Sequence, residues 1–237
     1  MITKRLFKDN LYEQVARIAK AVASPKRLEL VELLCQAPKA VEVLAREAGI
    51  SMKLASAHLK ALKAARLVVG ERQGKNITYR LTTNDVARLW VTIRLLAEDR
   101  LLELQHAVQQ LRQSAQEWDA SNQAELLRKA RNGDVVVIDV RPADEYDAGH
   151  LPYARSIPLA ELKTRLKELP RKKPVVAYCR GPFCLMAVDA VRLLNELGFD
   201  ALHLRDGVAE WNAGALRRNA GRSQNTSRRQ FCEPLRY

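Results

Sequence analysis

The chain has 237 residues, of which 47% are hydrophobic and 28% charged, a composition typical of globular proteins rather than disordered or fibrous ones. Its length is sufficient for two domains of ordinary size. We find neither a signal-peptide pattern nor an apolar run of about 18 residues, the length that a membrane span requires. These absences predict a cytoplasmic, reducing setting without a membrane partner.

The positive charge is concentrated in two parts of the chain. The formal net charge is +13, and residues 1–80 carry +9 of it. Residues 81–120 carry −2, residues 121–216 carry +1, and residues 217–237 carry +5. A basic first part beside a nearly neutral second part predicts a polyanionic partner for the first.

The chain is predicted to begin with helices. Apolar residues recur at helical spacing over residues 7–22. Ser24-Pro25 then provides an N-cap and a first helical residue for a helix over residues 26–35. Pro38 is expected to begin another short helix.

The turn Ala48-Gly49-Ile50 separates this short helix from a later one. Ser51 is placed to cap the later helix, which we expect to end near Ala64. Two short helices joined through a glycine-containing turn are typical of a helix-turn-helix. The residues expected on the inward face of the later helix are Leu54, Ala55, His58, Leu59 and Leu62.

A β-hairpin is expected next. Two runs rich in β-branched residues, Leu67–Val69 and Ile77–Leu81, flank the sequence Gln73-Gly74-Lys75-Asn76. The hairpin therefore has a basic tip, as the wing of a winged helix does.

Residues 8–115 resemble the winged-helix repressors of the arsenic-repressor (ArsR) family. The match is carried by Ser24-Pro25-Lys26-Arg27-Leu28, Ser51, Ser56-Ala57-His58-Leu59-Lys60-Ala61-Leu62, Leu67-Val68, Arg72, Gly74 and Tyr79-Arg80-Leu81. The resemblance implies that the later helix enters the major groove of double-stranded DNA. Lys and Ser side chains suit phosphates and base edges there. The candidate DNA-binding residues are Ser51, Lys53, Ser56, Ala57, His58, Lys60, Arg72 and Lys75.

A long helix is predicted from Asn84 to about Trp118, followed by a linker over residues 115–123. Its apolar stripe is too broad for the small winged core and requires a partner helix. In the ArsR family this helix pairs with the first helix across a two-fold axis. The resemblance therefore implies a homodimer that binds an inverted-repeat operator.

The second half contains a cysteine in a chemically favourable position. The apolar run Val175–Tyr178 predicts a buried strand, and residues 186–197 follow with helical spacing. Cys179 thus lies in a tight loop between the end of a strand and the start of a helix. Backbone amides converge there and the helix dipole favours an anion, so we predict a lowered pKa and a nucleophilic thiolate.

The order of motifs from Asn122 to Leu216 resembles the rhodanese family of sulfurtransferases. The matching motifs are Val137-Ile138-Asp139-Val140-Arg141, Glu145-Tyr146, Gly149-His150-Leu151, Ser156-Ile157-Pro158, Leu197-Gly198-Phe199, Leu204-Arg205-Asp206-Gly207 and Trp211. The resemblance implies that Cys179 carries sulfur as a persulfide. It further implies that the persulfide is held by the loop amides of Arg180, Gly181, Phe183 and Cys184, because Pro182 has no N–H.

The chain departs from the rhodanese pattern at two positions and from that of related phosphatases at a third. Cys184 stands where many rhodaneses have Arg or Thr, and it is a candidate resolving thiol or simply fills the last loop position. Tyr153 replaces the usual glycine of the family. Related phosphatases need one more loop residue and an Arg where Leu185 stands, which argues against phosphoryl chemistry.

Other candidate residues have structural interpretations. Asp139 and Arg141 are expected to form a fold-stabilising ion pair at the site, and His150 to hold a loop or line the edge of the site. His58 is expected to pack in its helix or to contact phosphate. Cys35 is expected in the core and Cys232 in a disordered tail, but the sequence assigns neither a role.

Metal sensing is the weaker interpretation. Glu103 and His106 lie three residues apart on the long helix, but metal-sensing relatives have more ligands there. The helix after Pro38 lacks the paired cysteines of arsenic- or cadmium-binding relatives. We therefore expect no metal and no cofactor.

The sequence predicts a multidomain chain. A mainly-α winged helix-turn-helix domain over residues 1–118 precedes an α/β rhodanese-like domain over residues 119–216, which has a central parallel sheet. A basic tail over residues 217–237 follows. We expect a DNA-binding transcriptional regulator that responds to reactive sulfur species. The alternatives are a sulfurtransferase that uses thiosulfate or polysulfide and is anchored by its winged domain, and a metal-responsive repressor.

Overall fold

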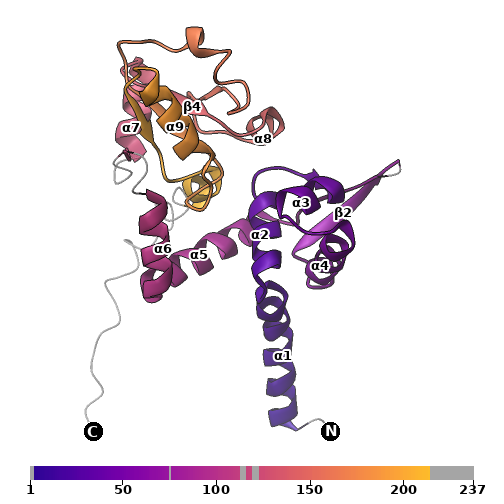
Figure 1. Cartoon of the computed structure of the whole chain (residues 1–237). Coiled ribbons are helices and arrows are strands. Elements are labelled where there is room, and N and C mark those ends of the chain that lie inside the picture. The colour runs from indigo at the N-terminus through magenta and orange to yellow at the C-terminus, as the bar shows by residue number, and fades with distance from the viewer. Residues whose placement is uncertain (1–2, 75, 113–115, 119–122, 214–237) are drawn as a thin grey trace, which may run out of the picture.

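The computed structural model describes residues 3–74, 76–112, 116–118 and 123–213. Figure 1 shows two lobes that follow one another along the chain. Lys75, Cys232 and the predicted tail lie outside the described residues, as does most of the predicted linker.

The first lobe is mainly helical. Its opening elements are α1 (Lys4–Val22), α2 (Pro25–Leu34), β1 (Lys39–Ala40), α3 (Val41–Glu47) and α4 (Met52–Ala64). Ser51 caps α4 as predicted, since its side chain accepts a hydrogen bond from the backbone N–H of Leu54. Ser24 precedes α2, but its side chain makes no capping bond. The short helix after Pro38 is also preceded by a strand, β1, that the pattern did not reveal.

A small antiparallel sheet completes this lobe. The predicted hairpin is present as β2 (Val68–Gln73) and β3 (Asn76–Leu81), and β1 adds to the free side of β3 in the order β1-β3-β2. The core beneath it contains Leu30, Leu44, Leu59 and Leu62, each fully buried. The sheet and the helices therefore share one hydrophobic cluster.

The predicted long helix is interrupted. The chain forms α5 (Asn84–Arg100) and α6 (Leu102–Arg112), separated by Leu101 in an extended conformation. The side-chain amide of Gln105 donates to the backbone oxygens of Glu98 and Asp99, which satisfies carbonyls freed by the break. The prediction of one continuous helix to Trp118 was therefore wrong.

The second lobe contains the predicted parallel sheet. Its elements are α7 (Gln123–Asn132), β4 (Val136–Asp139), α8 (Ala143–Ala148), β5 (Arg155–Ser156), a single 3-10 turn (Leu166–Glu168), β6 (Val175–Tyr178), α9 (Met186–Glu196) and β7 (Ala201–His203). The strand order is β5-β4-β6-β7, and all pairs are parallel. The carboxyl ends of these strands meet at one edge, where parallel α/β folds place their functional residues.

Both faces of this sheet are covered. Ile138 and Ala177 pack into one cluster with α9, while Val137 and Val176 pack into another with α7 and Trp211. The side chains of successive strand residues therefore point to opposite faces of the sheet. All of them are buried, as expected for a parallel sheet between helices.

The boundary between the lobes differs from the prediction. Backbone hydrogen bonds join Trp118 N to His203 O and His203 N to Gln116 O, which adds this short segment beside β7. Residues 116–118 thus belong to the sheet of the second lobe rather than to the end of the first. Among the described residues, no helix is both long and apolar enough to cross a membrane.

Candidate functional site

The two thiols of the second lobe lie together at the carboxyl edge of the sheet. Cys179 follows the last residue of β6, and Cys184 closes the loop before α9. We call residues 179–184 the cysteine loop. Cys179 is only 2% exposed, whereas Cys184 is partly exposed, and neither forms a disulfide. The Cys179 sulfur lies 3.3 Å from the Cys184 backbone oxygen, and the two cysteine side chains are hydrogen-bonded to each other.

The protonation of the pair is the reverse of the prediction. The hydrogen bond from Cys179 lowers the pKa of Cys184 to about 7. The pKa of Cys179 is raised well above its ordinary value, first by the same bond and then by burial. One proton is shared, so the less buried sulfur holds the negative charge while the buried one keeps its hydrogen. The expected low pKa at Cys179 was therefore wrong for the reduced protein.

The amides around the sulfurs come from both ends of the loop. Backbone N–H groups of Gly181 and Ala187 bond to the Cys179 sulfur, and those of Arg180 and Met186 bond to the Cys184 sulfur. The amide of Cys184 donates instead to the Gly181 oxygen over 3.0 Å. Of the amides predicted to hold sulfur on Cys179, that of Gly181 contacts Cys179, that of Arg180 contacts Cys184 instead, and that of Cys184 is already bonded to the Gly181 oxygen.

The amides of Met186 and Ala187 were not predicted from the sequence. They belong to the first turn of α9, whose N–H groups have no partner within the helix. The signal was present, since the loop was predicted to lead into a helix start. The amide of Phe183, which was also predicted to hold sulfur, is not among the groups that contact either sulfur.

Asp139 and Arg141 form the predicted ion pair beneath the loop. Both side chains are completely buried, and Arg141 Nη2 lies 2.6 Å from Asp139 Oδ2. The hydroxyl of Tyr178 donates to the same carboxylate oxygen over 2.6 Å. This network fixes the ends of β4 and β6, the two strands that position the site.

His150 lies outside this network. Its ring stacks on Tyr146 at 3.9 Å between centroids, and Nδ1 lies 3.0 Å from the Tyr146 backbone oxygen. The imidazole is exposed. His150 therefore holds the segment after α8, and its contacts do not include either sulfur.

The outer side of the cysteine loop is tightly enclosed. A Cβ at Gly207 would lie 2.5 Å from the backbone oxygen of Arg180, so only glycine fits there. Gly181 has φ of +146°, and a Cβ on it would lie 3.1 Å from a carboxylate oxygen of Glu210. The Glu210 side chain in turn accepts from the Gly207 amide over 3.0 Å. These close contacts restrict the backbone conformation of the cysteine loop.

Four charged side chains join the loop to the first lobe. The Arg180 guanidinium pairs with Glu145 of α8, its Nε lying 3.0 Å from both carboxylate oxygens, and with Glu47 of α3 over 2.9 Å. Lys39 pairs with Glu145 over 2.8 Å and with Glu47 over 3.5 Å. The side chains of Lys39 and Glu145 are at most 2% exposed. Figure 1 shows α8 facing α3 across this junction.

Two uncharged contacts complete the junction. The Gln36 amide donates to the backbone oxygen of Arg180 over 3.3 Å, and its oxygen accepts from Arg141 over 3.0 Å. The ring of Phe183 meets Trp90 of α5 edge to face, with 6.2 Å between centroids. The loop that carries both thiols is thus in direct contact with the helical lobe.

The outer face of α4 carries the candidate DNA-binding residues. Ser51, Lys53, Ala57 and Lys60 are exposed, whereas Ser56 and His58 are half-buried. Leu54 was expected on the inner face, but it is 43% exposed, while Ala55, Leu59 and Leu62 are buried as predicted. Arg72 on the wing is exposed and donates to the Gly74 backbone oxygen. Lys75 lies outside the described residues.

The remaining candidates do not form a site. Cys35 is partly buried, and its pKa is raised by burial and by Glu210 and Glu32. Glu103 and His106 belong to α6, and the described residues contain no group of three side chains able to hold a metal ion.

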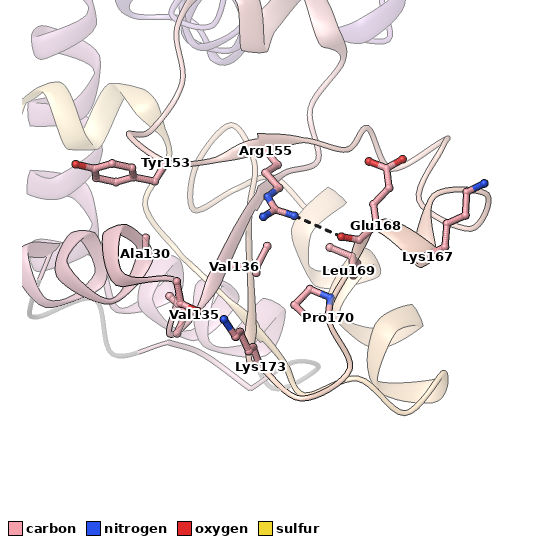
Figure 2. Close-up of a pocket in the computed structure, with 11 residues that line it drawn as sticks. Ala130, Val135, Val136, Tyr153, Arg155, Lys167, Glu168, Leu169, Pro170 and Lys173 are labelled. Atoms are coloured by element: carbon pink, nitrogen blue, oxygen red, sulfur yellow. Dashed lines mark hydrogen bonds between the residues drawn. The ribbon is translucent and has the colours of Figure 1, made fainter.

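A separate pocket of about 350 Å³ lies at the opposite edge of the sheet (Figure 2). Val136 begins β4 there, and Arg155 and Lys173 lie on either side of it. Both basic groups donate to backbone oxygens, Arg155 to Glu168 and Lys173 to Gly133. The pocket includes neither thiol, and two of its three basic side chains, Arg155 and Lys173, are already engaged.

Comparison with known proteins identifies both lobes. Residues 24–69 match the model of bacterial regulatory proteins of the arsR family, and residues 122–214 match the rhodanese-like domain. The chain is 43% identical over 206 residues to the HTH-type transcriptional regulator Rv0324 of Mycobacterium tuberculosis, which covers 87% of this chain and 90% of that protein. The chain is an ArsR-family transcriptional regulator with a rhodanese-like domain.

Two further relatives each resemble one half of this regulator. A sulfurtransferase of Allochromatium vinosum is 32% identical over 85 residues, which are 35% of this chain and 78% of that protein. The winged helix-turn-helix fragment of Mb0332 from Mycobacterium bovis, solved as a homodimer, is 39% identical. It covers 44% of this chain and 94% of the fragment, with a TM-score of 0.39.

Proposed function

We propose that this regulator binds DNA as a homodimer and responds to reactive sulfur species through the cysteine loop. The observation that carries the sulfur response is the hydrogen-bonded pair of Cys179 and Cys184, which faces four backbone amides. A negative charge on sulfur is stabilised by such amides at a helix start. The site can therefore hold a thiolate and, after reaction, a persulfide anion.

The first chemical step uses both thiols. The Cys184 thiolate removes the proton of Cys179 along their hydrogen bond, and the Cys179 sulfur attacks the outer sulfur of thiosulfate. A Cys179 persulfide anion forms and sulfite leaves. With a polysulfide as donor, the leaving group is the shortened polysulfide. The amides of Gly181 and Ala187 already bond to this sulfur and support the charge.

The second step oxidises the pair. The Cys184 sulfur attacks the inner sulfur of the Cys179 persulfide, which forms the disulfide and expels the outer sulfur as hydrosulfide. The donated sulfur is thereby reduced to sulfide and the two thiols are oxidised. No metal or organic cofactor takes part. The low exposure of Cys179, which is only 2% exposed, favours a sensor over an enzyme that turns over rapidly.

Intact mass spectrometry tests the sulfur chemistry. Treatment with thiosulfate or polysulfide should add one sulfur to Cys184→Ser, whereas the wild type should lose two hydrogens as the disulfide closes. Cys179→Ser should neither gain sulfur nor transfer it to cyanide. Sulfur that appears first on Cys35 or Cys232 would contradict the assignment, and rapid sustained transfer to cyanide would favour the sulfurtransferase alternative.

The exposed face of α1 supports the dimer. Apolar side chains follow one another along this helix and are 36–70% exposed in a single chain: Leu6, Phe7, Leu11, Tyr12, Val15 and Ile18. Figure 1 shows α1 extending away from the rest of the lobe. A large exposed apolar surface of this kind is typical of a protein interface. Sedimentation of the wild type as a dimer, and of a Phe7→Ser and Val15→Ser double variant as a monomer, is the expected result.

The proposed DNA binding is tested by using the full chain to select sequences from a pool of random duplexes. Two α4 helices of a dimer would read half-sites about one helical turn apart, so selection should recover an inverted repeat. Enrichment of no sequence by a properly dimeric protein would exclude specific operator binding.

A further inference from the structure

The cysteine loop contacts three separate elements of the DNA-binding lobe. Gln36 in the turn after α2 donates to the Arg180 carbonyl, Glu47 of α3 pairs with the Arg180 guanidinium, and Trp90 of α5 packs against Phe183. These partners are about 90 to 144 residues away in sequence from the loop. The site of sulfur chemistry and the helix-turn-helix are therefore direct neighbours.

The charged part of this contact is balanced and largely buried. Lys39 and Arg180 supply two positive charges, while Glu47 and Glu145 supply two negative ones. Charges buried away from water depend on good geometry with their partners, so a small displacement weakens the whole group. Such a cluster favours one arrangement of the lobes strongly over its neighbours.

The contact residues immediately flank the two thiols. Arg180 follows Cys179, and Phe183 precedes Cys184. The negative charge of the Cys184 thiolate also acts on the Arg180 guanidinium, after the larger effects of burial, Glu145 and Glu47. Linking the two sulfurs removes that charge and draws together the two ends of the loop. Both contact side chains are then attached to a changed backbone.

We propose that the cysteine loop transmits its sulfur state to the DNA-binding lobe through Arg180 with Glu47 and through Phe183 with Trp90. In the dithiol state these contacts hold α3 and α5 in place. In the disulfide state formed by donated sulfur, Arg180 and Phe183 withdraw and both helices are released. This inference rests on the proposed function and names the contacts by which it operates.

Release of α3 would directly affect α4, the helix that carries candidate DNA-binding residues. α3 is joined to α4 by the turn at Gly49, whose φ of +61° few other residues adopt. Leu44 of α3 and Leu59 of α4 share the same buried cluster. Packed helices move as a unit, so a shift of α3 changes the angle at which α4 presents Lys53 and Lys60.

The test uses the full chain with two interface variants and a matched control. Glu47→Gln removes the charge that pairs with Arg180, and Phe183→Leu keeps apolar bulk but removes the ring contact with Trp90. Glu29→Gln neutralises a glutamate of α2 that is paired with Lys26 and partly exposed. Each protein is treated with polysulfide, its sulfur state is confirmed by intact mass, and its affinity for the selected operator is compared with that of the reduced form.

Sulfur treatment should change the operator affinity of the wild type and of Glu29→Gln by about 5- to 150-fold, the usual range of coupling between sites. Glu47→Gln and Phe183→Leu should form the same disulfide, but their affinities should change less than about twofold. If either variant changes its operator affinity as much as the wild type does, the contact that it removes does not transmit the sulfur state. Comparing ratios rather than absolute affinities removes any effect of the substitution on basal binding.

Hydrogen exchange separates this inference from the proposed function. The amides of α3 should exchange faster in the disulfide form of the wild type than in the dithiol form, without any DNA present. Unchanged exchange in α3 would overturn the inference even if operator affinity shifts. If exchange rises but operator affinity stays constant, the contact operates as inferred and the proposed regulatory function fails.

Discussion

The outer face of α4 and the junction between the lobes both contain basic residues, yet they use charge in opposite ways. Lys53 and Lys60 of α4 are exposed and have no ion pair among the described residues. Lys39 and Arg180 at the junction are each held by two carboxylates and are largely removed from water. An unpaired exposed cation is available for a phosphate, whereas a paired buried cation specifies an arrangement. The two regions therefore differ in whether their basic side chains are free to bind an external anion or are already paired within the chain.

The largest expected effect comes from breaking the buried group. Glu145 bonds to both Arg180 and Lys39, which overcome the opposing effect of burial and lower its pKa. Glu145→Gln leaves two cations without adequate compensation and should destabilise the fold by about 3–5 kcal/mol. Urea denaturation followed by tryptophan fluorescence measures the change.

An exposed pair in the same lobe provides the control. Glu168 pairs with Arg165 at the surface, and Glu168→Gln should reduce the stability far less than Glu145→Gln does. Equal losses for the two variants would show that burial does not distinguish the junction from the surface.

A smaller effect, dependent on pH, is expected at Glu32 on the α2 side of the junction. Burial, and then the charge of Glu210, raise the pKa of Glu32 to about 7. A carboxyl whose pKa is raised by folding stabilises the protein fully below its ordinary value. That contribution is lost as pH rises from about 4.5 to 7.

Glu32→Gln lacks this ionisation. It should leave stability nearly unchanged at pH 4.5 and increase it relative to wild type above pH 7, by up to about 3 kcal/mol at about 1.4 kcal/mol per pKa unit. Denaturation midpoints at a series of pH values would measure the difference. A difference that does not grow with pH would show that Glu32 is not held in its neutral form.

The shared proton of the two thiols gives a shift in reactivity. Cys184 should be alkylated with a midpoint near pH 7, because Cys179 donates a hydrogen bond to its thiolate. Cys179→Ala removes that donor and should move the midpoint toward about 8.5, the ordinary thiol value. Iodoacetamide kinetics with mass assignment of the labelled cysteine would measure it. An unchanged midpoint would mean that the backbone amides alone stabilise the thiolate.

The contrast between the two regions also explains what the sequence could predict. Ser51 caps α4, and Ala55, Leu59 and Leu62 are buried, because helix caps and apolar periodicity depend on neighbours within a few residues. The strand that ends at Tyr178 was equally clear from its composition. Local patterns therefore predicted both folds and the position of Cys179.

The junction could not be predicted in this way. Nothing near Glu47 or Gln36 in the sequence indicates that each meets a loop more than 100 residues later. The break at Leu101 was missed for a similar reason. Glu98 just before it binds Arg205 of the second lobe, a contact that helical periodicity cannot reveal. The protonation of the thiols depended on burial and on a sulfur–sulfur hydrogen bond, neither of which spacing alone determines.

The smallest effect is expected on the exposed face, at a single lysine of α4. Lys60→Ala removes one candidate phosphate contact, so binding should weaken similarly for specific and nonspecific DNA. The slope of log affinity against log salt concentration should fall by about 1, since one fewer counterion is released. Lys163→Ala removes the same charge from an exposed position in the second lobe and should leave the slope unchanged. If both variants lower the slope equally, DNA responds to the overall charge of the chain rather than to the α4 face, and the distinction between a binding surface and a signalling junction would fail on the DNA side.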